Sequence, residues 1–249
     1  METMVKQLES GVYTLEESLK VEEALLKLSA SPEVVGLVPE AKAWREHLLG
    51  AKKDGDLEER EYALLELYRT LHTAGSGYSK EEQERLNQQK GLHGLSGGLM
   101  PLFLAARLMD ETTRMVDLGA GNGLQGILLQ RLAPHAHTLQ VELSSSHVAM
   151  GKLFQKVSGV PQSRMDWHIG DLFKAELGTP HLIYLYRPVR PSEVTKPLYQ
   201  KLAKTMETME PAPTIVSVAD CLTPHFSQNH HPLYASDFII ITKPGSCQN

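Results

Sequence analysis

The chain has few of the features that mark secreted or membrane-spanning proteins. Its 249 residues include only two cysteines, Cys221 and Cys247, which are too few for a disulfide framework. We therefore expect free thiols in a reducing compartment. No apolar run approaches the roughly 18 residues that a membrane-spanning helix needs. The first residues lack the basic start and apolar stretch of a secretory signal. These absences predict a cytoplasmic protein without a membrane partner.

Positive charge is also scarce. The net charge is −5; residues 1–90 hold 12 lysines and arginines against 18 acids, and residues 91–249 hold 13 against 12. A protein that contacts many phosphates usually presents a basic stripe, and no such stripe runs through this sequence. The pattern disfavours nucleic acid and leaves a small molecule or a protein as the expected acceptor partner.

The chain divides into three parts. With 41% hydrophobic residues it can bury a sizeable core. Residues 1–90 form an acidic region in which apolar side chains recur at helical spacing, and Thr14 with Glu17 predicts a capping box at a helix start. Residues 91–98 form a glycine-rich connector that we read as a hinge or as a loop over a ligand. Residues 99–249 form the core.

Two further boundaries are predicted within the helical region. A helix that starts near Pro39 is expected to stop at Gly50, before the charged turn 52–56. Ser79 with Glu82 forms a second capping-box pattern and predicts another, polar helix.

In the core, short apolar runs alternate with helical stretches. The expected strands are 115–118, 138–143, 166–169, 182–186, 214–218 and 238–242, and the expected helices are 124–132, 145–157 and 193–209. Such alternation predicts a doubly wound, mostly parallel α/β sheet with helices on both faces. We expect the last strand to close the sheet, with the stretch before it as its hairpin partner.

The most informative stretch is 115–123, which reads Met-Val-Asp-Leu-Gly-Ala-Gly-Asn-Gly. It is a buried strand that carries an acid near its end and continues through three glycines into a helix. The first turn of a doubly wound sheet lies at the edge where ligands bind. Glycines there let a ligand approach the backbone, and the following helix offers free N–H groups. Asp117 could hold a cation or the cationic end of a ligand.

This stretch resembles the nucleotide-binding first motif of the class I S-adenosylmethionine-dependent methyltransferase superfamily. The resemblance runs from about Arg114 to Asp171, roughly a quarter of the chain. It implies a Rossmann-like core, S-adenosylmethionine as cofactor, S-adenosylhomocysteine as product and an unknown methyl acceptor. The cofactor-binding residues that it implies in the turn are Asp117, Gly119, Ala120, Gly121, Asn122 and Gly123.

Two further acids stand where the resemblance expects them. Glu142 ends the second strand and would accept hydrogen bonds from the ribose hydroxyls, with Leu143 beside it in the site. Asp171 follows the third strand and would accept from the adenine amino group, while Leu172 would pack against the base. Asp117 would lie near the methionine amino end. Taken singly, Glu142 could be a solvated strand-end acid and Asp171 a turn cap.

The end of the fourth strand often borders the reacting atom in this superfamily. There, Tyr186 and Arg187 are candidates for the acceptor pocket, and Arg187 could bind an anionic group. They could equally pack against helices and cap a loop. Members that methylate planar amino groups usually carry Asn/Asp-Pro-Pro-aromatic there. The Tyr-Arg-Pro-Val of this chain argues against that chemistry. No catalytic base is assignable; weaker candidates are Tyr78, Gln88, His93 and Ser96.

Two alternatives use the same turn. Residues 121–126 match the dinucleotide pattern G-x-G-x-x-G, and Glu142 follows 19 residues after Gly123. However, that pattern leaves Asp117 without a role, and the 136 residues from Arg114 onward are too few for an added substrate domain. The second alternative is a non-catalytic S-adenosylmethionine-binding module that acts through a partner.

Cysteine and histidine side chains gather between the last strands. Cys221, His225, His230 and His231 are metal-ligand types, but their spacing fits no zinc pattern. We therefore expect no metal.

Overall fold

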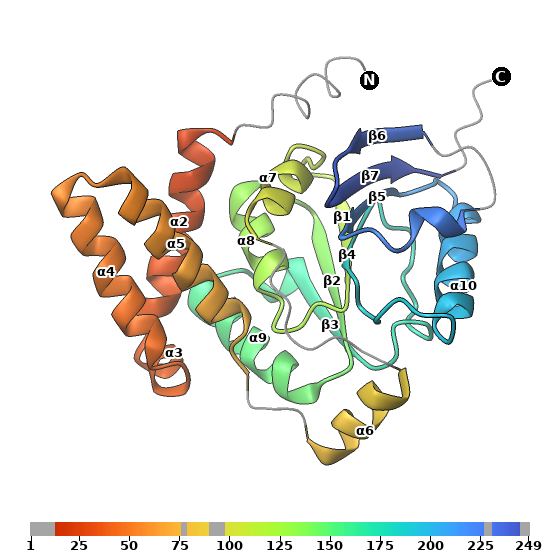
Figure 1. Cartoon of the computed structure of the whole chain (residues 1–249), viewed down its shortest axis with the longest axis horizontal. Helices are drawn as coiled ribbons and strands as arrows, with labels where there is room; N and C mark the ends of the chain where they lie inside the picture. The colour runs from red at the N-terminus through yellow and green to blue at the C-terminus, as the bar shows by residue number, and fades with distance from the viewer. Residues whose placement is uncertain (1–12, 76–78, 90–97, 227–230, 245–249) are drawn as a thin grey trace.

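The computed structural model describes residues 13–75, 79–89, 98–226 and 231–244. Its core is a seven-stranded sheet in the order β3-β2-β1-β4-β5-β7-β6 (Figure 1). The strands are β1 (Arg114–Leu118), β2 (His137–Glu142), β3 (Met165–Ile169), β4 (Leu182–Tyr186), β5 (Thr214–Val218), β6 (His231–Ala235) and β7 (Ile239–Lys243). Strands β3, β2, β1, β4 and β5 are parallel to one another. The predicted mostly parallel, doubly wound sheet is confirmed.

One prediction about the sheet edge is wrong. Strand β7 does not close the sheet, because it pairs antiparallel with β5 on one side and with β6 on the other. The two last strands form the expected hairpin, and β6 takes the edge. Pro232 lies in this edge strand, where a residue without an N–H does not interrupt a central ladder.

Helices cover both faces of the sheet. On one face, α7 (Met100–Ala106), α8 (Leu124–Leu132) and α9 (Ser145–Ser158) share a hydrophobic core with β1, β4, β5 and β7. On the other face, α10 (Lys196–Glu207) packs against β1, β2, β4 and β5. The connection 170–181 between β3 and β4 contains turns and no helix.

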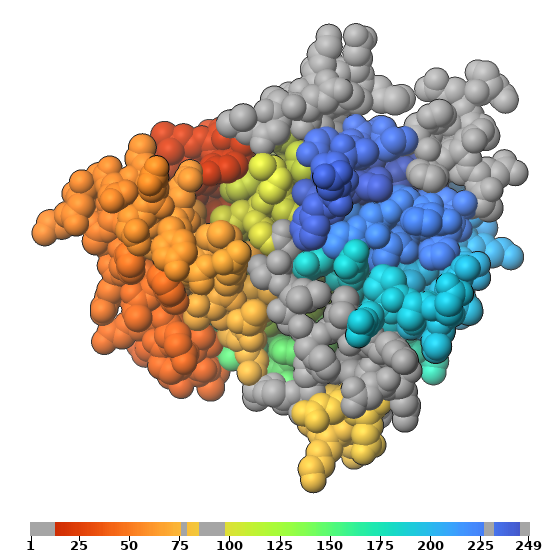
Figure 2. Space-filling model, in the orientation of Figure 1, coloured from red at the N-terminus to blue at the C-terminus, as the bar shows by residue number. Residues whose placement is uncertain are grey.

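The N-terminal helices are α2 (Leu15–Ala30), α3 (Pro32–Leu37), α4 (Glu40–Asp54) and α5 (Leu57–His72). They form a lobe on the α8 and α9 side, where α2 contacts both of those helices (Figures 1 and 2). Their buried side chains belong to the same hydrophobic core as α7, α8 and α9. The capping box of Thr14 and Glu17 is confirmed.

The predicted end of α4 is wrong. The helix continues through Gly50 to Asp54 and ends at Gly55, which has a φ of 73°. A left-handed backbone at the C-cap is a conformation that glycine adopts without steric penalty. Gly50 merely lies within the helix, and Lys52 and Lys53 occupy its last turn, where cations are favourable.

Helix α6 (Lys80–Gln89) stands at the lower rim of the molecule (Figure 2). Its predicted capping box is confirmed: the Ser79 N–H donates to Glu82 and the Glu82 N–H donates to the Ser79 hydroxyl. Of the glycine-rich connector predicted over 91–98, all but Gly98 lies outside the described residues. Across the described ranges, every helix is too short or too polar to cross a membrane.

Candidate functional site

The turn after β1 adopts the backbone that its glycines permit. Gly119, Gly121 and Gly123 have φ values of 79°, 58° and 65°, which other residues rarely adopt. A Cβ on Gly119 would lie 2.7 Å from Cβ of Pro188, and one on Gly123 would collide with Trp167. At Gly121, by contrast, no described atom lies within 4 Å of the place of a Cβ. Gly121 is therefore the glycine of this turn that leaves room for a ligand.

The same turn is fastened to β2 by backbone hydrogen bonds. The N–H groups of Gly119 and Ala120 donate to the Val141 carbonyl at 2.9 Å and 3.0 Å. The N–H of Gly123 donates to the Ala120 carbonyl at 2.8 Å. These hydrogen bonds hold the glycine turn, residues 119–123, beside the end of β2.

Glu142 connects the glycine turn to the start of α9. Its Oε2 accepts from the Gly121 N–H and its Oε1 accepts from the Ser144 N–H, each at 2.8 Å. The carboxyl group is buried, and burial raises its pKa, although these two hydrogen bonds act in the opposite direction. Leu143, next to it, is half-buried. The structure thus brings Glu142 to within a hydrogen bond of the glycine that faces open space.

Asp117 lies beneath the turn and is buried. It is 3% exposed, and its Oδ2 has no hydrogen-bond partner among the described residues. Burial, reinforced by the nearby charge of Glu142, raises the pKa of Asp117 to about 8. A buried carboxyl oxygen without a partner is costly, so Oδ2 needs a ligand, a water molecule or a proton to satisfy it.

Asn122 directs its side chain away from the open face of the turn. Its Nδ2 donates to the carbonyls of Leu71, His72 and Ala74 at 2.7, 3.1 and 2.9 Å. These carbonyls stand at the C-terminal end of α5, where a helix leaves acceptors without intrahelical donors. The backbone of Asn122 remains in the predicted site, but its side chain joins that site to the helical lobe.

A second contact links α5 to α8. The Gln125 amide reaches the Tyr68 hydroxyl at 3.3 Å and also contacts the His72 imidazole. Burial lowers the pKa of His72 to about 4, so the imidazole is neutral at pH 7. The helical lobe and the glycine turn are therefore joined through buried polar groups as well as through the apolar core.

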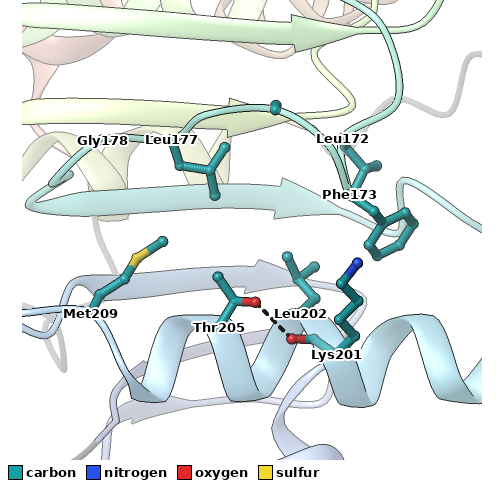
Figure 3. Close-up of a pocket in the computed structure, with 9 residues that line it drawn as sticks. Leu172, Phe173, Leu177, Gly178, Lys201, Leu202, Thr205 and Met209 are labelled. Carbon is teal, nitrogen blue, oxygen red and sulfur yellow. Dashed lines mark hydrogen bonds between the residues drawn. The ribbon is translucent and has the colours of Figure 1, made fainter.

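Asp171 and Leu172 lie in the loop after β3. Asp171 Oδ1 accepts from the Phe173 N–H at 2.9 Å, which makes Asp171 the cap of its own turn. Leu172 lines a pocket of about 110 Å³ between this loop and α10, and Lys201 extends toward Phe173 across it (Figure 3). The remaining lining is mainly apolar and includes Leu177, Leu202 and Met209.

The acceptor-pocket candidates make contacts within the protein. The Tyr186 ring meets the Phe238 ring edge-on at 5.8 Å between centroids. Arg187 Nε donates to the Ala219 carbonyl at 2.6 Å. Arg187 and Ala219 both have positive φ, 37° and 50°, which is strained for residues with a side chain. Arg187 thus bridges the ends of β4 and β5.

Sequence reasoning missed three polar residues near this site. The capping-box pattern predicts only a helix cap for Glu82, but its Oε1 also accepts from the N–H and hydroxyl of Ser145, so it links α6 to the start of α9. Gln140 and Tyr184 are buried in the interior of β2 and β4. A polar residue inside an apolar strand was the available signal for Gln140, whereas nothing in the sequence shows which residues flank Asp117.

Several weaker candidates cannot be placed. Tyr78, His93, Ser96 and His230 lie outside the described residues, and so do the side chains of Gln88 and His231. Cys221 is a buried free thiol. Within the described ranges, no three potential metal ligands come together.

No protein-family model matches the chain, and no curated protein matches it either. Solved structures similar to it include S-adenosylmethionine-dependent methyltransferases. An RNA methyltransferase from Salinibacter ruber, in complex with S-adenosyl-L-homocysteine, is 18% identical, with a TM-score of 0.43 over 68% of this chain and 92% of that one. The M. jannaschii tRNA m1G37 methyltransferase is 11% identical, with a TM-score of 0.44 over 62% and 50%.

A methyltransferase from Geobacter sulfurreducens, also in complex with S-adenosyl-L-homocysteine, is 19% identical, with a TM-score of 0.36 over 56% of this chain and 48% of that one. At these identities and TM-scores, the likenesses assign neither an activity nor a substrate to this chain.

Proposed function

We propose that the chain is an S-adenosylmethionine-dependent methyltransferase whose cofactor lies over the glycine turn. The observation that carries the proposal is the buried carboxyl group of Asp117, whose Oδ2 has no partner among the described residues, beneath a turn that is open at Gly121. Glu142 and Asp171 stand at the carboxyl ends of the next two strands along the same sheet edge. Ligands of doubly wound sheets bind at this edge.

The acids match the donors of the proposed cofactor. Asp117 would pair with the methionine ammonium group, Glu142 with the ribose hydroxyls and Asp171 with the adenine amino group. A carboxylate has about four lone-pair positions, so Glu142 and Asp171 keep acceptor capacity beyond their bonds to backbone N–H groups. The glycine turn would hold the ligand close to the backbone through Gly121.

The reaction would then depend mainly on alignment. When bound, S-adenosylmethionine supplies an electrophilic sulfonium methyl group, so the chain needs chiefly to hold the acceptor in line with it. Arg187 bridges the β4 and β5 ends and would keep this rim rigid beside the cofactor. An acceptor that starts protonated also needs a base or solvent to take its proton.

One observation weighs against a dinucleotide site. Dinucleotide folds use two parallel mononucleotide-binding halves, whereas the position beside β5 is taken here by β7, which runs antiparallel. Gly126 does pack closely on Gln140, as a third fingerprint glycine would. This packing brings helix α8 close to strand β2 whichever ligand binds at the turn, so it does not favour a dinucleotide.

The acceptor is the open part of the proposal. The charge distribution favours a small molecule or a protein, but two of the similar structures are RNA methyltransferases. An RNA acceptor therefore belongs among the substrates to be assayed. Arg187, the acceptor-pocket candidate, donates from Nε to the Ala219 carbonyl, so this N–H does not bind an acceptor. This observation favours a second candidate function, a cofactor-binding module without catalysis.

Isothermal titration with S-adenosylmethionine, S-adenosylhomocysteine and NAD tests the proposal. We expect micromolar binding of the first two ligands and none of NAD. Preferential binding of NAD, or no binding of the two adenosyl ligands, would contradict it. Formation of S-adenosylhomocysteine, slowly without acceptor or faster with cell extract, would separate the enzyme from the non-catalytic module.

A further inference from the structure

Three buried polar side chains lie in one row across the sheet. Asp117 is in register with Gln140 on β2 and with Tyr184 on β4. Residues in register on parallel strands point to the same face. The three side chains are 3%, 0% and 1% exposed. Asp117 Oδ2, Gln140 Oε1 and Tyr184 Oη each lack a hydrogen-bond partner among the described residues.

Such a row is unusual in a folded protein. More than about 90% of buried polar groups have a partner, and an unpartnered group destabilises the folded state. Three such atoms on adjacent strands, directly beneath the glycine turn, indicate a site that the described residues alone do not complete. Of the three side chains, only the Asp117 carboxylate can lose its buried charge by binding a proton.

Among the described residues, the charged group that acts on Asp117 is Glu142, which is negative. Tyr184 on β4 is influenced in turn by Asp117, by Tyr68 of α5 and by Tyr186, none of which is a cation. No ion pair to Asp117 occurs in the described part of the chain. Glu142 accepts two backbone N–H groups, which favour its charged form. Of these two carboxyl groups, Asp117 is therefore the one that we expect to hold a proton.

We propose that Asp117 carries a proton in the empty protein and releases it when the ammonium group of the cofactor binds at the glycine turn. The inference rests on the proposed function. The O–H bond of Asp117 breaks, the proton passes to solvent, and the ligand keeps its own ammonium protons and pairs with the carboxylate formed. Binding of the cofactor is thus coupled to the loss of one proton.

The coupling has a definite direction. A site that must lose a proton to bind its ligand binds more tightly as the pH rises toward the pKa of the free site. Below that pKa, which burial raises to about 8, affinity should rise about tenfold for each pH unit. Above it, the group is already ionised and affinity should level off.

Titration calorimetry with S-adenosylhomocysteine on the full chain tests the proposal. At pH 6.5 a ligand α-amino group is protonated, because its ordinary pKa is about 8. The dependence of the observed heat on buffer ionisation enthalpy, measured in phosphate and in Tris, counts the protons released. We expect close to one per ligand, and an approximately tenfold gain in affinity per unit between pH 6 and 7.5.

A ligand control separates the ammonium from the rest of the molecule. 5′-Methylthioadenosine has the adenine and ribose but no amino-acid end, so it should bind without releasing a proton. Binding of S-adenosylhomocysteine with no proton released and no pH dependence would overturn the proposal while leaving the proposed function intact. No binding of S-adenosylmethionine or S-adenosylhomocysteine at any pH would overturn both.

Two variants test whether the released proton comes from Asp117. Asp117→Asn should bind S-adenosylhomocysteine more weakly, with no proton released and a flat pH profile. Asp171→Asn is the matched control: it removes another acid of the site, so it should weaken binding but still release one proton. The titrations of the unaltered protein decide the proposal even if Asp117→Asn does not fold.

Discussion

The side-chain amide of Asn122 lies 2.7 Å from the backbone carbonyl of Leu71. This hydrogen bond joins the glycine turn to the end of α5, although the two residues are 51 positions apart in the chain. Two more carbonyls, of His72 and Ala74, converge on the same nitrogen. The helical lobe therefore helps to set the position of the turn over which we propose that the cofactor lies.

Replacing Asn122 by aspartate should weaken cofactor binding. The change removes the donor and places a carboxylate against three carbonyl oxygens in a buried setting, at a cost of about 2–3 kcal/mol. We expect a lower melting temperature and at least a tenfold loss of affinity for S-adenosylhomocysteine, measured by calorimetry. An unchanged affinity would mean that the turn keeps its position without α5.

Asp56→Ala provides the control for this prediction. Asp56 caps the opposite end of α5 by accepting from the Glu59 N–H at 3.0 Å. Loss of such a cap costs about 1 kcal/mol. This variant should lower the melting temperature with little effect on ligand affinity, because the C-terminal end of α5 remains bound to Asn122.

The three acids at the strand ends should each contribute to binding. Asp117→Ala, Glu142→Ala and Asp171→Ala each remove one charged hydrogen-bond acceptor, and we expect each to weaken cofactor binding by about 1–3 kcal/mol. Calorimetry or equilibrium dialysis with S-adenosylmethionine measures the change. If all three variants bind as tightly as the unaltered protein, the site lies elsewhere.

Gly121→Ala should separate ligand binding from folding. The φ of 58° costs a residue with a side chain about 1–2 kcal/mol, but the added methyl group meets no described atom and occupies the space left for the ligand. Gly55→Ala is the matched control, since Gly55 has a φ of 73° and equally open surroundings. Both variants should lose similar stability, whereas only Gly121→Ala should lose affinity. Equal affinities would show that the ligand does not approach this glycine.

Asp117 should also make the stability of the free protein depend on pH. Its pKa is raised in the folded state to about 8, from an ordinary value near 3.8. Between those values the folded state holds a proton that the unfolded state has lost, so this group's contribution to the free energy of unfolding declines as the pH rises. Asp117→Asn lacks this dependence.

Thermal unfolding of both proteins from pH 5 to pH 9 measures the effect. The melting temperature of the unaltered protein, minus that of Asp117→Asn, should fall by several degrees over this range. For a chain of this size, about 1 kcal/mol corresponds to about 2–4 °C. A constant difference would show that Asp117 is ionised in the folded protein throughout.

Local patterns predicted most of the fold. Apolar runs bounded by turns located β4 and β5 at their observed bounds, and both capping boxes occur where Ser/Thr and Glu stand three residues apart. These features depend on neighbouring residues, so the order of amino acids is enough to specify them. The glycine turn after β1 is of the same kind, because its backbone requires glycine at particular positions.

Local sequence patterns did not predict how segments distant in the chain pair with one another. The hairpin could be expected, but which of its strands would take the sheet edge depends on pairing with β5. The C-terminal end of α4 was misplaced because Gly50 and Gly55 look alike in sequence, and only Gly55 has the left-handed backbone.

The sequence by itself determined the class of fold, the glycine turn and the acids at the strand ends, since periodicity and turn chemistry are local. Only the tertiary structure decided what surrounds those acids. It placed Gln140 and Tyr184 beside Asp117 through strand register, and it placed Asn122 against α5 through packing of the helical lobe. Burial and the supply of hydrogen-bond partners are properties of the folded chain, and they govern whether a carboxyl group holds a proton.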